Sequence, residues 1–113
     1  MGSKYRAKKV TIDGITFDSK KEARRYQVLK MLERTGQIKD LKLQVPYELQ
    51  PSFKYDGKTV RAIKYVADFE YIMRGKNGNA VKVVEDTKGY KTEVYLLKKK
   101  MFLFKYGFEI TEV

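Results

Sequence analysis

The sequence predicts one α+β domain, with a mixed, mostly antiparallel sheet flanked by two helices in a three-layer arrangement. Its 113 residues suit a single domain. Apolar residues recur at helical spacing in residues 19–34 and 92–106, and they alternate with polar residues in segments between. Two Asp-Gly pairs signal hairpin turns. We therefore expect a small hairpin, a helix, three or four strands, a second helix and a final strand.

The first helix is expected from Ser19 to about Arg34. Ser19 followed by Glu22 three residues later is a capping-box pattern. Gly36 suits the position just past the end of a helix. The apolar residues at helical spacing should face the core, and they are Ala23, Tyr26, Leu29 and Leu32.

The strands are read from alternation and turn signals. Residues 10–17 should form a hairpin that turns at Asp13-Gly14. Residues 38–43 alternate imperfectly, and Pro46 interrupts the next segment, which we expect to be an edge strand because proline is tolerated there. The clearest strands follow a second hairpin turn at Asp56-Gly57, and they cover residues 61–73 and 81–87, joined by a turn over 75–79.

The second helix is expected over residues 92–106. Its buried stripe should follow the i, i+3, i+7, i+10 pattern of Val94, Leu97, Met101 and Phe104. A glycine at position 107 should end the helix, and residues 108–111 should form the last short strand.

Composition limits the chemistry and suggests the partner. The chain has no cysteine and no histidine, which excludes disulfides, thiolate zinc sites and imidazole catalysis. It has 25 basic and 14 acidic residues, a formal charge of +11, which favours a polyanion such as nucleic acid. The alternative is a lysine-rich protein that is merely soluble. No membrane span or signal peptide is visible, so we expect a cytoplasmic location.

Two carboxylates and a lysine form the candidate site. Asp68 lies on one arm of the hairpin predicted over residues 61–87, and Asp86 and Lys88 lie on the other. In ordinary register Asp68 comes alongside Asp86, while Lys88 shares the face of Asp86 and Glu85 points away. A carboxylate pair can hold Mg²⁺, or Mn²⁺ in its place. A lysine beside the ion can orient water or stabilise the charge of a phosphodiester transition state.

Each of these residues also has a structural interpretation. Asp86 and Lys88 could be an ordinary ion pair at a sheet end, and Asp68 could bridge to Lys88. Glu22 could serve only the capping box, because its carboxylate can accept from the Ser19 backbone N–H.

The motif resembles that of a known family. Asp68 followed by Asp86-Thr87-Lys88 on the next strand is similar to the PD-(D/E)XK pattern of restriction-endonuclease-like nucleases. The predicted order of helices and strands also resembles the core of that fold, and this resemblance covers nearly the whole chain. Residues 17–26 also resemble a phage-borne branch of that superfamily, and similar arrangements occur in small Holliday-junction resolvases. Two positions depart from the pattern: Ala67 replaces the proline, and the second acid is an aspartate.

The resemblance implies a Mg²⁺-dependent DNA endonuclease in a bacterial or phage-infected cell. Asp68, Asp86, Glu22 and the Thr87 carbonyl would be metal ligands, and Lys88 would position the attacking water. Structure-selective cutting of branched DNA would suit a small homodimer. The alternative is a non-catalytic basic nucleic-acid-binding module.

Basic residues outside the motif are expected to contact phosphates. Tyr55, Tyr90 and Tyr95 could stack on unpaired bases, but core packing or surface exposure explains each as well. The expected phosphate contacts are Lys91, Lys98, Lys99, Arg24, Arg25, Lys8 and Lys9, the last two in a basic N-terminal arm of residues 1–9.

Overall fold

The computed structural model describes residues 8–113 and has the predicted α+β architecture. The main sheet has the strand order β3-β6-β7-β8, in which β7 and β8 are parallel and the other pairs are antiparallel. Within the described residues, neither helix is long and apolar enough to cross a membrane. The principal elements are α1 (Lys20–Arg34), β3 (Ile38–Gln50), β6 (Ile63–Arg74), β7 (Ala80–Asp86), α2 (Glu93–Tyr106) and β8 (Thr111–Glu112).

Two small hairpins complete the fold, and both turn at the predicted Asp-Gly pairs. The Asp56-Gly57 turn has φ of +51° and +74°, which only Gly, Asn and Asp adopt readily. Of the predicted basic arm, residues 1–7 lie outside the described residues, while Lys8 and Lys9 are exposed. The hairpin strands are β1 (Val10–Ile12) with β2 (Ile15–Phe17), and β4 (Phe53–Tyr55) with β5 (Lys58–Val60).

Helix α1 begins and ends as predicted. The Ser19 hydroxyl accepts a hydrogen bond of 3.1 Å from the Glu22 N–H. Gly36, just past the helix, has φ of +80°. Ala23, Tyr26 and Leu29 are buried against the sheet, and Leu32 is partly buried.

Strand β3 is one continuous strand, so the predicted interruption at Pro46 is wrong. Pro46 pairs with Val66 in the middle of the β3–β6 ladder. Because β3 is the edge strand of the sheet, its other side needs no hydrogen-bond donors, and a proline without an N–H fits there.

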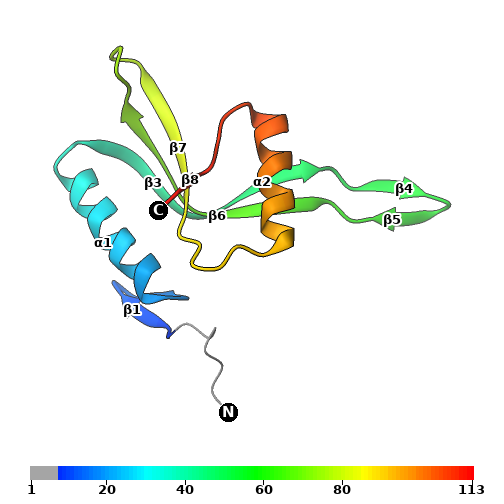
Figure 1. Cartoon of the computed structure of the whole chain (residues 1–113), viewed down its shortest axis with the longest axis horizontal. Coiled ribbons are helices and arrows are strands. Elements are labelled where there is room, and N and C mark those ends of the chain that lie inside the picture. The colour runs from blue at the N-terminus through cyan, green and yellow to red at the C-terminus, as the bar shows by residue number, and fades with distance from the viewer. Residues whose placement is uncertain (1–7) are drawn as a thin grey trace.

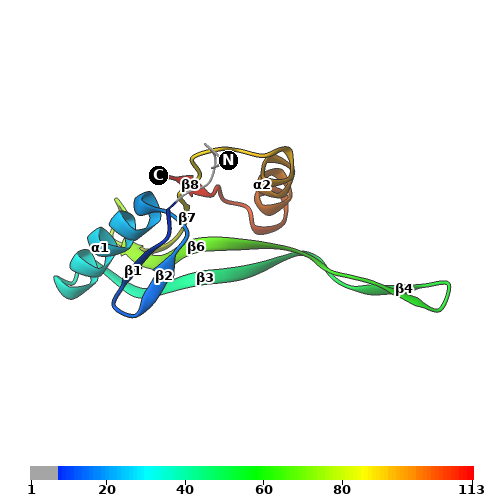
Figure 2. The ribbon, with the colours of Figure 1, turned by 90° about the horizontal axis from the view of Figure 1, so that it is seen from below.

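Two apolar clusters pack on the sheet, one under each helix. Val83 of β7 packs with the α1 cluster and its neighbour Val84 belongs to the α2 cluster. Because neighbouring residues of a strand point to opposite faces, the helices cover opposite faces of β7, which stands between them in Figure 1. Along the longer β3–β6 ribbon, the helices cover successive stretches on one side (Figure 2).

Asp68 lies where the sheet divides. β6 pairs with β7 only from Phe69 to Arg74, whereas it pairs with β3 along nearly its whole length. Before Phe69, therefore, β6 has β3 as its only strand neighbour in the described chain, and α2 covers that stretch instead. The chain places Asp68 at this change of partner.

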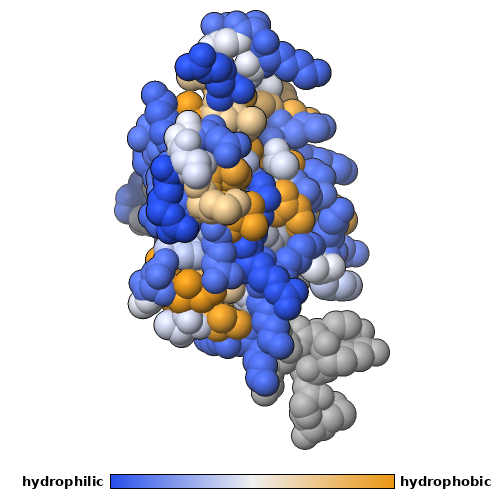
Figure 3. All heavy atoms as spheres, turned by 90° about the vertical axis from the view of Figure 1, so that its left-hand side faces the viewer, coloured by the Kyte–Doolittle hydropathy of each residue, from blue (hydrophilic) through white to orange (hydrophobic). Residues whose placement is uncertain are grey.

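The buried face of α2 differs from the prediction. Tyr95 and Phe102 are its buried residues, whereas Val94 is 60 % and Phe104 is 92 % exposed. Leu97, also predicted to be buried, is 59 % exposed. The helix carries apolar residues on nearly every side, so spacing alone could not select the core-facing stripe. The side of the molecule that carries α1 is mainly hydrophilic, with apolar residues in separate patches (Figure 3).

The last strand is shorter and later than expected. β8 contains only Thr111 and Glu112, and it pairs in parallel with Glu85 and Asp86. The preceding residues act as core instead, because Ile110 is buried and Phe108 packs against Phe102.

Residues 51–62, here called the finger, project from the body of the protein. They contain β4 and β5 and extend away from both helices as a thin ribbon (Figures 1 and 2). Every residue from 51 to 61 is exposed. The finger therefore adds little to the core.

Alanine substitution of one phenylalanine in the core and one in the finger should show how much each region contributes to stability. Phe102→Ala should lower the free energy of unfolding by about 3–5 kcal/mol, because Phe102 is fully buried. Phe53→Ala should cost no more than about 1 kcal/mol, because it loses only a cross-strand contact with Val60. Urea denaturation of both variants measures this difference, and equal losses would contradict the assignment of the core.

Candidate active site

The hairpin register brings Asp68 and Asp86 together. The ladder ends where Phe69 pairs with Glu85, so Asp68 and Asp86 lie side by side one position beyond it, as predicted, and the charge of Asp68 acts on Asp86. The Thr87 N–H and hydroxyl both donate to one oxygen of Asp68, at 2.9 and 2.7 Å. These two bonds fix the Asp68 carboxylate against the end of β7.

Asp86 is almost fully buried, with 1 % exposure. The Tyr65 hydroxyl donates to its Oδ2 at 2.6 Å. Its Oδ1 has no hydrogen-bond partner among the described residues, and the Lys88 ammonium lies 3.7 Å away from it. The pKa of Asp86 is raised to about 6, mainly by burial and also by the charge of Asp68, while Tyr65 and Lys88 oppose the rise.

Lys88 lies between solvent and the acid pair. Its side chain is 37 % exposed, and its ammonium lies 5.2 Å from the centre of the Tyr95 ring. The ring faces a cation, an attractive contact. Lys88 is therefore held near Asp86 without a close hydrogen bond to it.

Glu22 is a further acid near this pair and, like Asp86, it is buried. Its carboxyl accepts a 3.1 Å bond from the Gln44 side chain and a bond from the Asp18 backbone. Burial raises the pKa of Glu22 to about 7, and the charges of Asp68, Asp18 and Asp86 add to the rise. Ser19 caps the helix as the capping box requires, but the Glu22 carboxyl is directed to Gln44.

Gln44 is a site residue that the sequence did not reveal. The β3–β6 register sets it opposite Asp68, and it has φ of +52°. A non-glycine residue in this conformation costs of order 1 kcal/mol or more and is held by its surroundings. The only signal in the sequence is one polar residue between Leu43 and Val45.

Glu85 points to the other face of β7, as predicted. It is fully buried, where the Arg25 guanidinium donates two bonds to it, at 2.8 and 2.6 Å, and the Tyr71 hydroxyl donates a third. Arg25 was predicted to contact phosphate, but the structure engages its guanidinium with Glu85. That bond to Glu85 raises the pKa of Arg25.

Glu112 is a second residue that the sequence did not reveal. It lies beside Asp86 on β8, where it accepts from Tyr95 at 2.7 Å and pairs with Lys91 and Lys99 at 2.9 and 3.1 Å. The hydrogen bonds from Lys91 and Tyr95 hold the pKa of Glu112 well below its usual range. Two of the predicted phosphate contacts are thus already paired with a carboxylate.

The remaining predicted cations lie nearer to solvent. Arg24 lines a shallow hollow beside Thr87 together with Lys21 and Arg25. Lys98 is partly exposed on α2, and Lys8 precedes β1. Lys21 and Arg24 therefore lie near Thr87 at the edge of the acid pair, whereas Arg25 is paired with Glu85.

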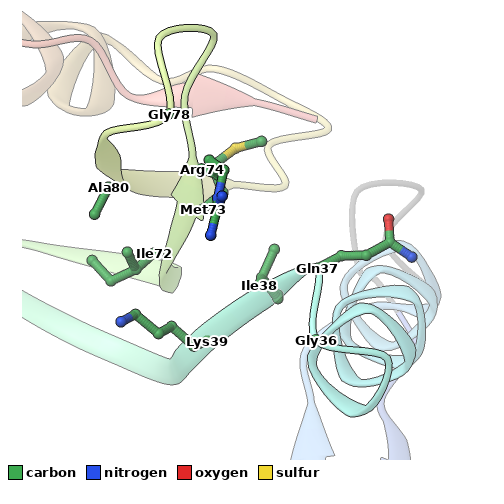
Figure 4. Close-up of a pocket in the computed structure, with 9 residues that line it drawn as sticks. All are labelled: Gly36, Gln37, Ile38, Lys39, Ile72, Met73, Arg74, Gly78 and Ala80. Carbon is green, nitrogen blue, oxygen red and sulfur yellow. The ribbon is translucent and has the colours of Figure 1, made fainter.

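A separate pocket lies at the far end of the sheet. It is formed where the α1–β3 turn meets the β6–β7 hairpin, and Figure 4 shows Lys39 and Arg74 among its lining residues. It includes none of the acids described above. The predicted site and this pocket are distinct.

Comparison with known proteins gives a family but no reaction. The family described as "Protein of unknown function (DUF1064)" matches residues 2–111. The chain belongs to the DUF1064 family. No curated protein and no solved structure matches it significantly.

The acids of the DUF1064 site fit a divalent ion only in part. Among residues 8–113, no three acidic side chains lie close enough together to hold one ion. Two carboxylates do face each other, and the unpartnered Oδ1 of Asp86 is a buried acceptor that a cation would satisfy. Mg²⁺ commonly uses one or two carboxylates and keeps several waters. Asp68 and Asp86 fit that requirement, and Glu22 lies beyond it in this arrangement.

The raised pKa of Glu22 predicts a pH-dependent stability effect. A raised carboxyl pKa stabilises the fold below pH 4.5, and this contribution is lost as the pH rises through about 7. Glu22→Gln removes the charge but keeps an acceptor for Gln44. We expect the variant to be more stable than the wild type by about 2–3 kcal/mol at pH 8, and by less than about 0.5 kcal/mol at pH 4.5.

Chemical denaturation of the DUF1064 protein at the two pH values measures this effect. The control is Glu109→Gln, because Glu109 is exposed and its loss should change stability by less than about 0.5 kcal/mol at either pH. A Glu22→Gln variant that is equally or less stable at pH 8 would show that the carboxylate is not strained by burial.

Proposed function

We propose that this protein is a metal-dependent endonuclease that hydrolyses phosphodiester bonds of DNA. One observation carries the proposal: within residues 8–113, one oxygen of the buried Asp86 accepts no hydrogen bond, and it lies beside a second aspartate and 3.7 Å from a lysine ammonium. Burying like charges side by side destabilises a fold. Binding of a cation and a phosphate at this site would explain why the chain keeps these charges together.

Different residues would hold the metal ion and contact the phosphate. Thr87 holds Asp68 in place, and Tyr65 holds Asp86, so both acids are oriented before any ligand arrives. Together with the Thr87 carbonyl they would hold Mg²⁺ or Mn²⁺, which would lower the pKa of a bound water and stabilise charge on the scissile phosphate. The Lys88 ammonium, partly exposed, would meet the phosphate from the solvent side.

Glu22 would act beside the acid pair. Its pKa of about 7 lets it exchange a proton near neutral pH, which suits a group that takes a proton from water. Gln44 positions it by donating to its Oε2. The net charge of +11 supplies salt-sensitive affinity for the DNA backbone.

Cleavage assays with two matched pairs of variants test the proposal. Plasmid and a four-way junction are incubated with Mg²⁺ or Mn²⁺. Asp86→Asn and Lys88→Met should each lower the cleavage rate about 100-fold or more, because each removes a group that acts on the transition state. The controls Asp40→Asn and Lys76→Met make the same charge changes at exposed positions and should cleave as the wild type does.

Two results would contradict the proposal. The first is wild-type protein that binds DNA but cleaves none of these substrates with either metal, which favours the non-catalytic binding module. The second is Asp86→Asn that cleaves as fast as the wild type. Preference for the junction over plasmid would support structure-selective cutting.

We also propose that the protein acts as a homodimer through α2. The Phe104 ring protrudes from the helix with 92 % exposure, beside a hollow lined by apolar and basic residues. A second hollow lies on the other flank of α2, between Leu103 and Ile110. The protruding face of α2, here called the ridge, includes Phe104. Two copies related by a two-fold axis can pack together here, because the ridge of each copy can enter a hollow of the other. Two equivalent sites would suit branched DNA.

Light scattering after size-exclusion chromatography tests the dimer. The double variant Leu97→Ser with Phe104→Ser should shift the protein from dimer to monomer, because it removes apolar area from the ridge. The matched control is Val28→Ser with Met31→Ser on α1, which are also exposed and should leave the dimer intact. A wild-type monomer at high concentration would reject the proposal.

A further inference from the structure

Packing of the core does not explain the presence of the finger. Its two short strands are joined by Asp56-Gly57 and receive no cover from either helix (Figure 2). An isolated two-stranded hairpin is only marginally stable in water. Ordering residues 51–62 also costs conformational entropy. A ligand that binds the ordered ribbon would offset both terms.

The charge of the finger indicates the ligand. It carries Lys54, Lys58 and Arg61 against the single carboxylate of Asp56. Among residues 8–113, no ion pair involves any of the three cations, whereas several lysines elsewhere are paired with glutamates, such as Lys91 with Glu112. Unpaired cations on a projecting ribbon favour a polyanion.

The two faces of the finger differ. Phe53 pairs with Val60 and Tyr55 pairs with Lys58, so these side chains share one face. Lys54 and Thr59 lie on the other face, where the lysine donates to the threonine hydroxyl at 2.7 Å. Tyr55 is 73 % exposed. One face thus carries the apolar and aromatic side chains together with Lys58, and the other carries Lys54 and Thr59, so each face has one cation.

The dimensions of the finger fit a DNA groove. Two strands lie about 4.8 Å apart, and the major groove of B-DNA, about 12 Å wide, admits a two-stranded ribbon. Six residues per arm at about 3.3 Å each give a reach of roughly 20 Å, or about six base-pair steps of 3.4 Å.

We propose that the finger is a DNA-binding ribbon that enters the major groove of the duplex flanking the acid pair. The inference rests on the proposed function for the position of the cut, but not for the contact itself. Arg61 precedes β6 and lies seven residues before Asp68, which is roughly 23 Å of extended chain at about 3.3 Å per residue. The finger therefore grips duplex on one side only, some six to twelve base pairs from the acid pair.

A deletion tests the finger without disturbing the sheet. Gln50 pairs with Ile63, so residues 51–62 can be replaced by Asn-Gly, which closes a hairpin in the same register. Affinity for duplex DNA of increasing length is measured without divalent metal, so that cleavage plays no part. The deletion should weaken binding to long duplex about tenfold or more. The affinity of the wild type should rise as the duplex extends past six base pairs on one side of the binding site, whereas the affinity of the deletion variant should not.

A charge reversal with a matched control isolates the electrostatic part. Lys54→Glu, Lys58→Glu and Arg61→Glu together should reduce the slope of log affinity against log salt by about three. Lys39→Glu, Arg74→Glu and Lys76→Glu make the same change at the opposite end of the sheet, also at exposed positions. That control should retain more affinity for the extended duplex than the finger variant.

The outcomes separate this inference from the endonuclease proposal. Unchanged affinity and unchanged length dependence in the deletion variant overturn the finger, whatever the wild type cleaves. If the deletion instead abolishes a dimer while DNA affinity holds, the finger binds a second copy and the inference is also overturned. If the wild type never cleaves but the deletion loses affinity as expected, the finger stands and the endonuclease proposal fails.

Discussion

The arrangement depends on two neighbouring aspartates, of which Asp86 is buried and Asp68 is partly buried. Asp86 is 1 % exposed, and it lies beside Asp68 one position beyond the last β6–β7 pair, Phe69 with Glu85. Burial disfavours the charged form of Asp86, and the charge of Asp68 adds to this effect, so both raise the pKa of Asp86. Tyr65 and Thr87 each satisfy one acid oxygen and leave the repulsion unresolved. The fold keeps an unfavourable electrostatic interaction that its packing alone does not require.

The same region contains backbone strain. Gln44 adopts φ of +52° in the middle of a strand, directly across from Asp68, and its amide reaches Glu22. Strained residues persist only where their surroundings over-determine them, and they concentrate at functional sites. Strain, buried charge and an unpartnered oxygen thus coincide at the point where the sheet divides. This coincidence is a stronger sign of a site than any one of the three.

Much of the fold follows from local patterns in the sequence. Helix α1, its cap at Ser19 and the Asp-Gly turns are short-range features, and each was predicted because its cause lies within a few residues. The register that joins Asp68 to Asp86 was also predictable, because a tight turn between two clear strands fixes it.

Other features depend on partners distant in the chain. The outward orientation of Phe104 on α2, the pairing of Arg25 with Glu85 and the pairing of Lys91 with Glu112 are set by tertiary contacts. A helix that is apolar on all sides gives no periodic signal for its buried face. The role of Gln44 depends on its backbone conformation, for which glutamine gives no cue in the sequence.

The cluster around Glu85 has a consequence for how the strands can align. Glu85 and Asp86 are adjacent acids on opposite faces of one strand, so a slip of one position would turn each acid to the other face. The slipped hairpin would leave the Arg25 guanidinium without its two-pronged partner and would set a longer acid opposite Asp68. Breaking a buried pair in this way costs several kcal/mol. The Arg25–Glu85 ion pair thus fixes the register of the hairpin. It thereby maintains the arrangement of Asp68 and Asp86 on the opposite face of β7, which it does not contact.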